Sequence, residues 1–433
     1  MIKKYSAVLK KCPDIYEAAK KVYDLCANDT ERLCAAAFSP AAVMYTMWIL
    51  SKAEEKGIKR LYFLARDGYT MYHTALALCR RFGINIECSY FYCSRYALRM
   101  AAYRFLDDSA FDKLFLYSYK VSPYIMLKRA GFSKADRQSV YVSIGFKGDE
   151  KALMNRGEFA AFREKARTDE RFRALLISKS DSAYECFEAY VKQEKIGFYD
   201  HVGIVDLGWT GSMQYTLSRL LYNMGVKTQV TGFYMGMLNA PPSEISYETW
   251  LFTEKSRRIK AWFSHNLVEC VFSAPHGQTM GYARTGDGIS PVLAPDEPDG
   301  NTEFARSAEH TAVSIAENIK NKNFNEEYRK LALSLLKEVM MYPDKQEAEV
   351  LGVIRFCDDV GEQYHKSIAE KGVSDKLKKE LIRHKLMNRD STDGYYWYYG
   401  SLAAGDVRFK SYYRQGYRFT RYILSCISDL TSN

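Results

Sequence analysis

The chain has 433 residues, of which 47% are hydrophobic and 14% aromatic, and its formal net charge is +10. This length and composition suit a large core divided into two or three packed units. The basic excess suits a phosphorylated ligand or an anionic membrane surface. No dense Lys/Arg run is interleaved with aromatic residues, so we expect no nucleic-acid partner.

Cysteine usage and the apolar runs indicate the cellular compartment. The ten cysteines show neither a CxxC pair nor a Cys/His spacing suited to zinc. The start, MIKKYSAVLKK, lacks the apolar segment of a signal peptide. The longest apolar run, AAAFSPAAVMYTMWIL, is too short and too broken to span a membrane. We therefore expect a soluble, cytoplasmic protein.

The first part of the chain predicts helices followed by a strand–helix–strand unit. Residues 14–56 show helical periodicity, with a long apolar helix from about residue 39. Residues 61–65 form a compact apolar strand that closes in the charged turn ARDG. TMYHTALALCRRFG then predicts a helix that stops at Gly83, and IECSYFYCSRYAL predicts a second strand. This spacing is typical of a parallel sheet covered by helices.

The sheet is interrupted and then resumes. Residues 105–195 are charged and helical in pattern, which predicts a helical insertion. HVGIVDLG predicts a strand, followed by a helix to about Tyr222 and by a strand in VKTQVTGFYMGML. The segment GDGISPVLAPDEPDGN is the clearest linker and places a boundary near 285–303. We thus predict an α/β fold with a parallel-sheet core in 1–104 and 196–290, the insertion, and a helical region in 304–433.

Three loops follow the predicted strands: ARDG (65–68), CSRYALR (93–99) and DLGWTGSMQ (206–214). Ligands bind at the carboxyl ends of parallel strands, and each of these loops places charged or small residues there. In the third loop two glycines permit close backbone approach, two hydroxyls can donate, and the following helix offers unpaired N–H groups. These features predict a phosphate cradle made by Gly208, Thr210, Gly211 and Ser212.

Asp206 leads the third loop, and its carboxylate suits sugar hydroxyls or a magnesium ion. The alternative is a capped strand–helix turn with Ser212 as N-cap and Trp209 as packing. In the first loop, Arg66 offers a fork matched to phosphate oxygens, and Gly68 allows backbone amides to approach. The neighbouring Asp67 suits a magnesium ligand or a base; the alternative is a surface Arg–Asp pair.

Other candidates carry weaker signals. Arg95 and Arg99 are four residues apart on one helical face, which suits either a phosphate clamp or a solvated face. Glu269 lies in an apolar run, where an unpaired carboxylate is costly. His276 follows in a turn as a proton shuttle or a surface histidine. The tail DGYYWYYGSLAAGDVRFKSYYRQGYRF suits a carbohydrate groove, a membrane surface or a packed helix.

An Arg-Gly turn after one strand and a later D-x-G-x-T-G-S loop resemble the phosphoribosyltransferases. In that family the first loop binds pyrophosphate and the later loop grips the ribose and 5-phosphate of phosphoribosyl pyrophosphate. The four motifs RLYFLARDGY, YFYCSRYALR, GIVDLGWTGSMQ and LVECVFSAPHG together resemble the glycan phosphoribosyltransferase module of bacterial ribofuranosyltransferases. That module often follows a phosphatase of the haloacid-dehalogenase type and is encoded among surface-polysaccharide genes, such as those for O-antigen or capsule.

The resemblance implies a glycosyltransferase that moves 5-phosphoribosyl from phosphoribosyl pyrophosphate to a glycan acceptor, expected to be lipid-linked, with Mg²⁺ as cofactor. The chain has no D-x-D-x-T phosphatase motif, so the resemblance implies a separate phosphatase acting in trans. The resemblance also implies that Asp67 and Asp206 bind the metal ion and that Asp67, Asp206 and Glu269 are the catalytic residues. The implied substrate-binding residues are Arg66, Gly68, Ser94, Arg95, Arg99, Gly208, Trp209, Thr210, Gly211, Ser212, Gln214 and His276.

Two alternatives remain at this point. The stretch from Asp206 to Thr210 matches the nucleophile pattern of haloacid-dehalogenase-type hydrolases, except that Gly208 stands where their acid/base aspartate belongs. A sugar-phosphate hydrolase with Asp206 as nucleophile is therefore the second hypothesis. A non-catalytic protein that binds phosphorylated glycans is the third. Peripheral contact with the inner face of a membrane is compatible with the transferase.

Overall fold

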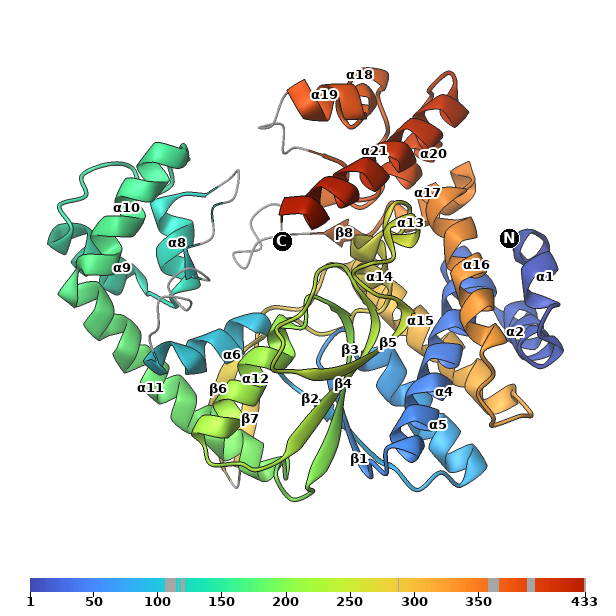
Figure 1. Cartoon of the computed structure of the whole chain (residues 1–433), viewed down its shortest axis with the longest axis horizontal. Coiled ribbons are helices and arrows are strands. Elements are labelled where there is room, and N and C mark those ends of the chain that lie inside the picture. Colours follow the sequence, from blue (N-terminus) through green and yellow to red (C-terminus); the bar gives the residue numbers. More distant parts are fainter. Residues whose placement is uncertain are drawn as a thin grey trace.

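An all-parallel five-stranded sheet forms the centre of the computed structural model, in the order β2-β1-β3-β4-β5 (Figure 1). The structure describes residues 1–105, 114–115, 117, 121–286, 288–356, 366–387 and 394–431. The predicted α/β class with a parallel sheet is confirmed. The strands are β1 (Arg60–Leu64), β2 (Glu87–Phe91), β3 (His201–Trp209), β4 (Gln229–Met237) and β5 (Ser246–Phe252).

The strand order changes direction at β1. The chain adds β2 on one side of β1 and then returns to add β3 on the other side, where Leu61 pairs with Gly203 and Phe63 with Val205. Loops that leave β1 and β3 therefore diverge at the carboxyl edge of the sheet. This is the position at which open parallel sheets form ligand crevices. Two of the three predicted site loops lie there.

Helices cover both faces of the sheet (Figure 1). On one face lie α4 (Ser39–Glu55), α5 (Tyr69–Phe82), α15 (Asp299–Asn318) and α16 (Glu327–Met341), packed in the core that contains Phe63 and Val205. The helical stretch Asp29–Glu55 is long and apolar enough by composition to cross a membrane, yet its most apolar window is 100% buried inside the fold. It is apolar on all sides because it packs as the central helix of this core.

On the opposite face, Tyr62 and Ile204 share a second cluster with α11 (Glu170–Gln193) and α12 (Ser212–Asn223). The hairpin β6 (Thr279–Thr285) and β7 (Gly288–Leu293) joins this side, and Tyr282 stacks on Tyr190 with ring centroids 4.7 Å apart. The prediction that residues 285–303 form a linker was therefore wrong, because this segment contains the strand β7. Turn-rich residues there close an antiparallel hairpin, and its second strand leads into α15.

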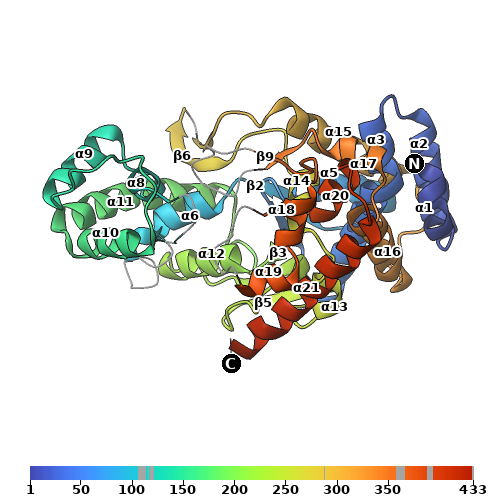
Figure 2. The same cartoon turned by 90° about the horizontal axis from the view of Figure 1, so that it is seen from above.

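The insertion is helical, as predicted, where the structure describes it; residues 106–113, 116 and 118–120 lie outside the described part. It comprises α8 (Pro123–Arg129), α9 (Lys134–Ser143), α10 (Arg156–Thr168) and the first half of α11. These helices bury a cluster of their own around Met126, Phe132, Phe159 and Phe172. Figures 1 and 2 both show them projecting from one side of the sheet. The insertion thus has its own small core.

The C-terminal region packs its aromatic residues inward. Trp397 Nε1 donates to the Met340 carbonyl at 2.8 Å, and the rings of Tyr398 and Tyr417 stack with centroids 3.9 Å apart. The packed-helix interpretation of the tail therefore describes these residues. The elements not yet named are α1 (Ile2–Leu9), α2 (Pro13–Leu25), α3 (Asp29–Leu33), a π-helical turn (Cys34–Phe38), α6 (Arg95–Ala102), a 3₁₀ turn (Tyr103–Phe105), α13 (Arg257–Lys260), α14 (His265–Val271), α17 (Lys345–Leu351), β8 (Arg355–Phe356), β9 (Lys366–Ser367), α18 (Ser374–Lys379), α19 (Ile382–Met387), α20 (Tyr398–Ala404) and α21 (Lys410–Thr431).

Tyr45 ties α4 to the sheet and gives a test of the fold. Its hydroxyl lies 2.9 Å from the Asp206 carbonyl and 2.8 Å from the Phe233 carbonyl, and its ring stacks on Trp250. We expect Tyr45→Phe to lower the free energy of unfolding by about 1–2 kcal/mol, because a buried donor is lost while its acceptors stay in place. Denaturant titration measures this, with the exposed Tyr412→Phe as a control that leaves stability unchanged.

Candidate functional site

Two carboxyl groups lie close together at the carboxyl edge of the sheet, where β1 and β3 are neighbours. Asp67 lies in the turn after β1, Asp206 lies in β3, and their side chains are close enough to share a proton. Asp206 is 6% exposed and its Oδ1 has no hydrogen-bond partner among the described residues, whereas Asp67 is half-buried. We call this the acid pair. The structure thus brings together the two carboxylates that the sequence assigned to a metal and to catalysis.

The acid pair titrates abnormally. Burial, followed by the negative charge of Asp67, raises the pKa of Asp206 well above that of an ordinary carboxyl. Burial also raises the pKa of Asp67, and Asp206, Arg66 and Arg95 oppose this rise. Two carboxyl groups in contact away from water cannot both ionise at low cost. The pair therefore keeps a proton at a pH where isolated carboxyl groups have lost theirs.

The turn after β1 is set by backbone geometry. Arg66 has φ +71°, and the Gly68 N–H donates to the Leu64 carbonyl at 2.8 Å. A Cβ at Gly68 would lie 2.7 Å from that same carbonyl oxygen, so no other residue fits without a shift. The glycine thus lets the chain fold back on its own strand and aim Asp67 at β3. This packing role differs from the backbone–phosphate approach expected from the sequence.

Arg66 is held by a buried acid that the sequence analysis did not single out. Its guanidinium lies 2.9 Å from Glu297 Oε1 and 3.3 Å from Ser273 Oγ. The Glu297 side chain is only 8% exposed. The alternative of an Arg66–Asp67 surface pair is thus replaced by an Arg66–Glu297 pair across the crevice. A phosphate that binds Arg66 would share the guanidinium with Glu297.

His276 reaches the same turn through Tyr90. The Tyr90 hydroxyl accepts the Arg66 N–H at 2.8 Å and lies 2.8 Å from His276 Nε2. His276 Nδ1 faces the Gly277 carbonyl at 2.9 Å, so Nδ1 carries the hydrogen, and Tyr90 donates to Nε2. Burial lowers the pKa of His276, which favours this neutral form. His276 therefore braces the turn that carries Asp67.

Two arginines lie on α6, and Arg95 is the one close to the acid pair. Ser94 caps this helix by accepting the Ala97 N–H at 3.0 Å, and it donates to the Thr279 carbonyl at 2.6 Å. Arg95 is exposed and close enough to oppose the raised pKa of Asp67. Burial lowers the pKa of the half-buried Arg99, and repulsion from Arg95 adds to this. Neither arginine has a carboxylate partner among the described residues, an arrangement that suits an anion.

The third loop begins later than predicted, because β3 continues through Asp206 to Trp209. Gly208 has φ +108°, and a Cβ there would lie 2.5 Å from the Gly236 carbonyl oxygen of β4. Gly211, in the left-handed region at φ +67°, is the N-cap of α12, and Ser212 is its first residue. The alternative of Ser212 as N-cap is therefore wrong by one residue. Thr210 is exposed and its hydroxyl lies 3.1 Å from Ser212 Oγ.

Trp209 lies under the loop and does not face open solvent. It has φ +74° and is 7% exposed, and its ring packs against Phe252, Phe263 and His265. The indole N–H has no hydrogen-bond partner among the described residues. Trp209 thus connects β3 to the segment that leads into α14. These contacts agree with the alternative in which Trp209 serves in packing.

Two other predicted residues take different positions. Gln214 is 1% exposed, and its amide donates to the Val230 and Ser246 carbonyls and accepts from Tyr234. It ties α12 to β4 and β5 and does not join the acid pair. Glu269 is half-buried on α14, and its charge contributes to the raised pKa of Asp206. It is the third carboxylate near the crevice.

The acid pair is a modest fit to magnesium. No group of three or more His, Cys, Asp or Glu side chains in the described part of the chain could hold a metal ion. Magnesium, however, is commonly bound by one or two carboxylates together with substrate phosphates. A cation at the pair would replace the shared proton and satisfy the unpartnered Asp206 Oδ1. The residues therefore fit a metal that arrives with a phosphorylated substrate.

The chain matches none of the protein-family models and none of the curated proteins with which it was compared.

The acid pair gives a stability prediction with a definite sign. A carboxyl with a raised pKa in the folded state binds its proton more tightly there than in the unfolded chain. Stability is thus full below the unfolded pKa and falls as pH rises towards the folded pKa, by up to about 1.4 kcal/mol per pH unit for one proton.

We expect Asp206→Asn to flatten this fall and to be more stable than wild type at pH 8. Denaturant titrations between pH 4 and pH 8 measure the effect, and the exposed Asp406→Asn should reproduce the wild-type curve. A parallel loss of stability in wild type and Asp206→Asn across this range would contradict the shared proton.

Proposed function

We propose that this protein is a glycosyltransferase that moves a 5-phosphoribosyl group from phosphoribosyl pyrophosphate to a glycan hydroxyl, in bacterial surface-polysaccharide synthesis. The observation that carries the proposal is the acid pair with Arg95 close by, at the point where the strand order reverses, and with Arg99 four residues further along α6. Carboxylates there suit ribose hydroxyls, and uncompensated arginines suit a diphosphate leaving group. The four-motif resemblance to glycan phosphoribosyltransferase modules supplies the substrate.

Each of these side chains has a role in the proposed transfer reaction. Asp206 binds ribose hydroxyls. Arg95, with Arg99 and Arg66, neutralises the departing diphosphate, and the exposed Thr210 with the start of α12 receives the 5-phosphate. Bound magnesium, held by Asp67 and Asp206, would supply additional positive charge for the diphosphate.

Deprotonation of the acceptor is assigned to Glu269. Glu269 is half-buried on α14, and its charge reaches Asp206, which supports a role close to the reacting centre. The acceptor O–H gives its proton to Glu269, and the oxygen forms a bond to the ribose anomeric carbon. The bond from that carbon to the diphosphate breaks, and its electrons leave with diphosphate. A separate phosphatase then removes the 5-phosphate from the glycan.

A hydrolase with Asp206 as nucleophile is less well supported. Such an enzyme needs a second acid two residues later, and Gly208 occupies that position. The backbone there has φ +108° and a Cβ would meet the Gly236 carbonyl oxygen at 2.5 Å, so the strand pairing itself excludes an aspartate. The proton shared with Asp67 also weakens Asp206 as a nucleophile. A non-catalytic phospho-glycan binding protein would keep the arginines but need no acid pair.

The transfer reaction is tested with phosphoribosyl pyrophosphate, Mg²⁺ and lipid-linked or synthetic glycan acceptors, with products followed by mass. We expect a phosphoribosyl adduct, and a fall in its rate of roughly 100-fold or more in Asp206→Asn and Arg95→Ala, because each loses charge stabilisation at the reacting centre. Asp406→Asn, an exposed carboxyl in the C-terminal region, is the control and should retain the rate.

Full adduct formation by both Asp206→Asn and Arg66→Ala would refute the transferase. Release of inorganic phosphate that depends on Asp206, without adduct, would favour the hydrolase. Binding of the glycan without any product would favour the third hypothesis.

Magnesium binding has its own readout. We expect millimolar Mg²⁺ to raise the Tm of the wild-type protein at pH 8, because the ion replaces the shared proton and binds only the folded chain. In Asp206→Asn one ligand is neutral, and the rise should disappear. Differential scanning fluorimetry measures both, with and without phosphoribosyl pyrophosphate. An equal shift in the two proteins would place the metal elsewhere.

A further inference from the structure

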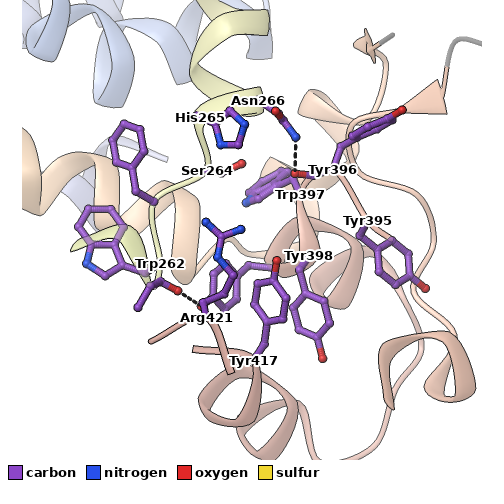
Figure 3. A pocket seen from close by; sticks show the side chains of 13 residues that line it. Trp262, Ser264, His265, Asn266, Tyr395, Tyr396, Trp397, Tyr398, Tyr417 and Arg421 are labelled. Atoms are coloured by element: carbon purple, nitrogen blue, oxygen red, sulfur yellow. Dashed lines mark hydrogen bonds between the residues drawn. The ribbon is translucent and has the colours of Figure 1, made fainter. Parts of the chain in front are cut away.

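A second candidate site lies between α14 and the C-terminal helices. A cavity of about 60 Å³ is enclosed by residues 261–266, residues 395–399 and two side chains of α21, Tyr417 and Arg421. Since one water needs roughly 10–15 Å³ by this measure, the cavity holds about four to six waters or one tetrahedral oxyanion. Figure 3 shows the Arg421 guanidinium pointing into this space beside Ser264.

The charge of the cavity is positive and uncompensated. Arg421 donates one hydrogen bond to the Lys260 carbonyl at 3.2 Å and has no carboxylate partner among the described residues. No acidic side chain of the described residues lines the cavity. Burial, with the charges of Arg421 and Arg95, lowers the pKa of His265 to about 4, so His265 is neutral at pH 7. A half-buried guanidinium without an acid suits an anionic ligand.

Ser264 adds an unused donor. Its Oγ is buried and has no hydrogen-bond partner among the described residues, although the residue precedes α14 as its N-cap. A buried hydroxyl without a partner costs free energy unless a ligand supplies the missing hydrogen bond. Figure 3 shows this oxygen on the cavity side of the chain. The Ser264 hydroxyl, at the N-cap of α14, and the Arg421 guanidinium, on α21, thus line the same small cavity.

The walls and the position of the cavity limit what enters. Stacked Tyr398 and Tyr417 line it beside the arginine, and Trp397 is nearly fully buried against it. On the other side, the His265 ring lies 5.8 Å from that of Trp209, at the end of the strand that carries Asp206. An occupant would therefore lie next to the acid-pair crevice but outside it.

We propose that the Arg421–Ser264 cavity binds a phosphoryl group, either as free phosphate or as part of a phosphorylated small molecule. Arginine presents a planar fork of donors to phosphate oxygens, the serine hydroxyl supplies a further donor, and a tetrahedral oxyanion fits the volume. This inference does not depend on the proposed transfer reaction.

The test measures binding of inorganic phosphate and of ribose 5-phosphate by calorimetry, in an Arg95→Ala/Thr210→Ala background that disables the proposed diphosphate and 5-phosphate sites. We expect Arg421→Gln to weaken both ligands roughly tenfold to a hundredfold, as for loss of a charged hydrogen bond. Arg418→Gln, an exposed arginine on the same helix, is the matched control and should bind as its background does. Unchanged binding in Arg421→Gln would overturn the proposal.

Ser264→Ala separates binding from folding. The substitution removes a hydroxyl that the protein itself does not use, so thermal stability should stay the same or rise while phosphate binding weakens by about threefold or more. A loss of stability without a loss of binding would overturn the role of Ser264. Binding of inorganic phosphate but not of ribose 5-phosphate would identify free phosphate as the occupant, and an absence of binding of both would overturn the proposal. An absence of glycan transfer leaves these outcomes unaffected.

Discussion

The contact between Asp67 and Asp206 is the constraint on which the rest of the site depends. Two carboxyl groups removed from water repel each other unless a proton or a cation lies between them. In this fold the pair lies where the loops after β1 and β3 diverge, with Arg95 close by, and the repulsion between the two carboxyl groups is tolerated there. Asp206 cannot move away, because its strand is fixed on both sides by β1 and β4 and its carbonyl lies 2.9 Å from the Tyr45 hydroxyl. A pair held this rigidly is prepared for a cation or for sugar hydroxyls.

Glycines make this geometry sterically feasible. Gly68 allows the turn after β1 to fold against Leu64, and Gly208 allows β3 to pass the Gly236 carbonyl without a side chain between them. Both glycines stood out in the sequence as ligand-contacting residues, yet in the structure they serve the backbone. The distinction matters for function, because an aspartate at position 208 is excluded by strand pairing and not only missing from the sequence.

The strand–helix–strand pattern, the helical insertion and the three loops were predictable because each depends on local periodicity or on residues adjacent in sequence. The acid pair was only half predictable: Asp67 and Asp206 were each identified, but their contact depends on the strand order, which no local pattern encodes. β5 was missed because SYETWLF carries a short signal among turn residues. Of the hairpin β6–β7, β6 was not predicted, and β7 lies in the segment that was interpreted as a linker. Glu297 lies after that hairpin, so its pairing with Arg66 across more than two hundred residues had no sequence signal.

Trp209 lies between the acid pair and the Arg421–Ser264 cavity. It is the last residue of the strand that carries Asp206, adopts φ +74° and packs on His265 at the edge of the cavity. A bulky ring in a conformation that favours glycine is costly, and the cost is offset here by contacts with Phe252, Phe263 and His265. His265 lines the cavity and contacts the ring that ends β3. One aromatic contact thus joins the strand that carries Asp206 to the wall of the cavity.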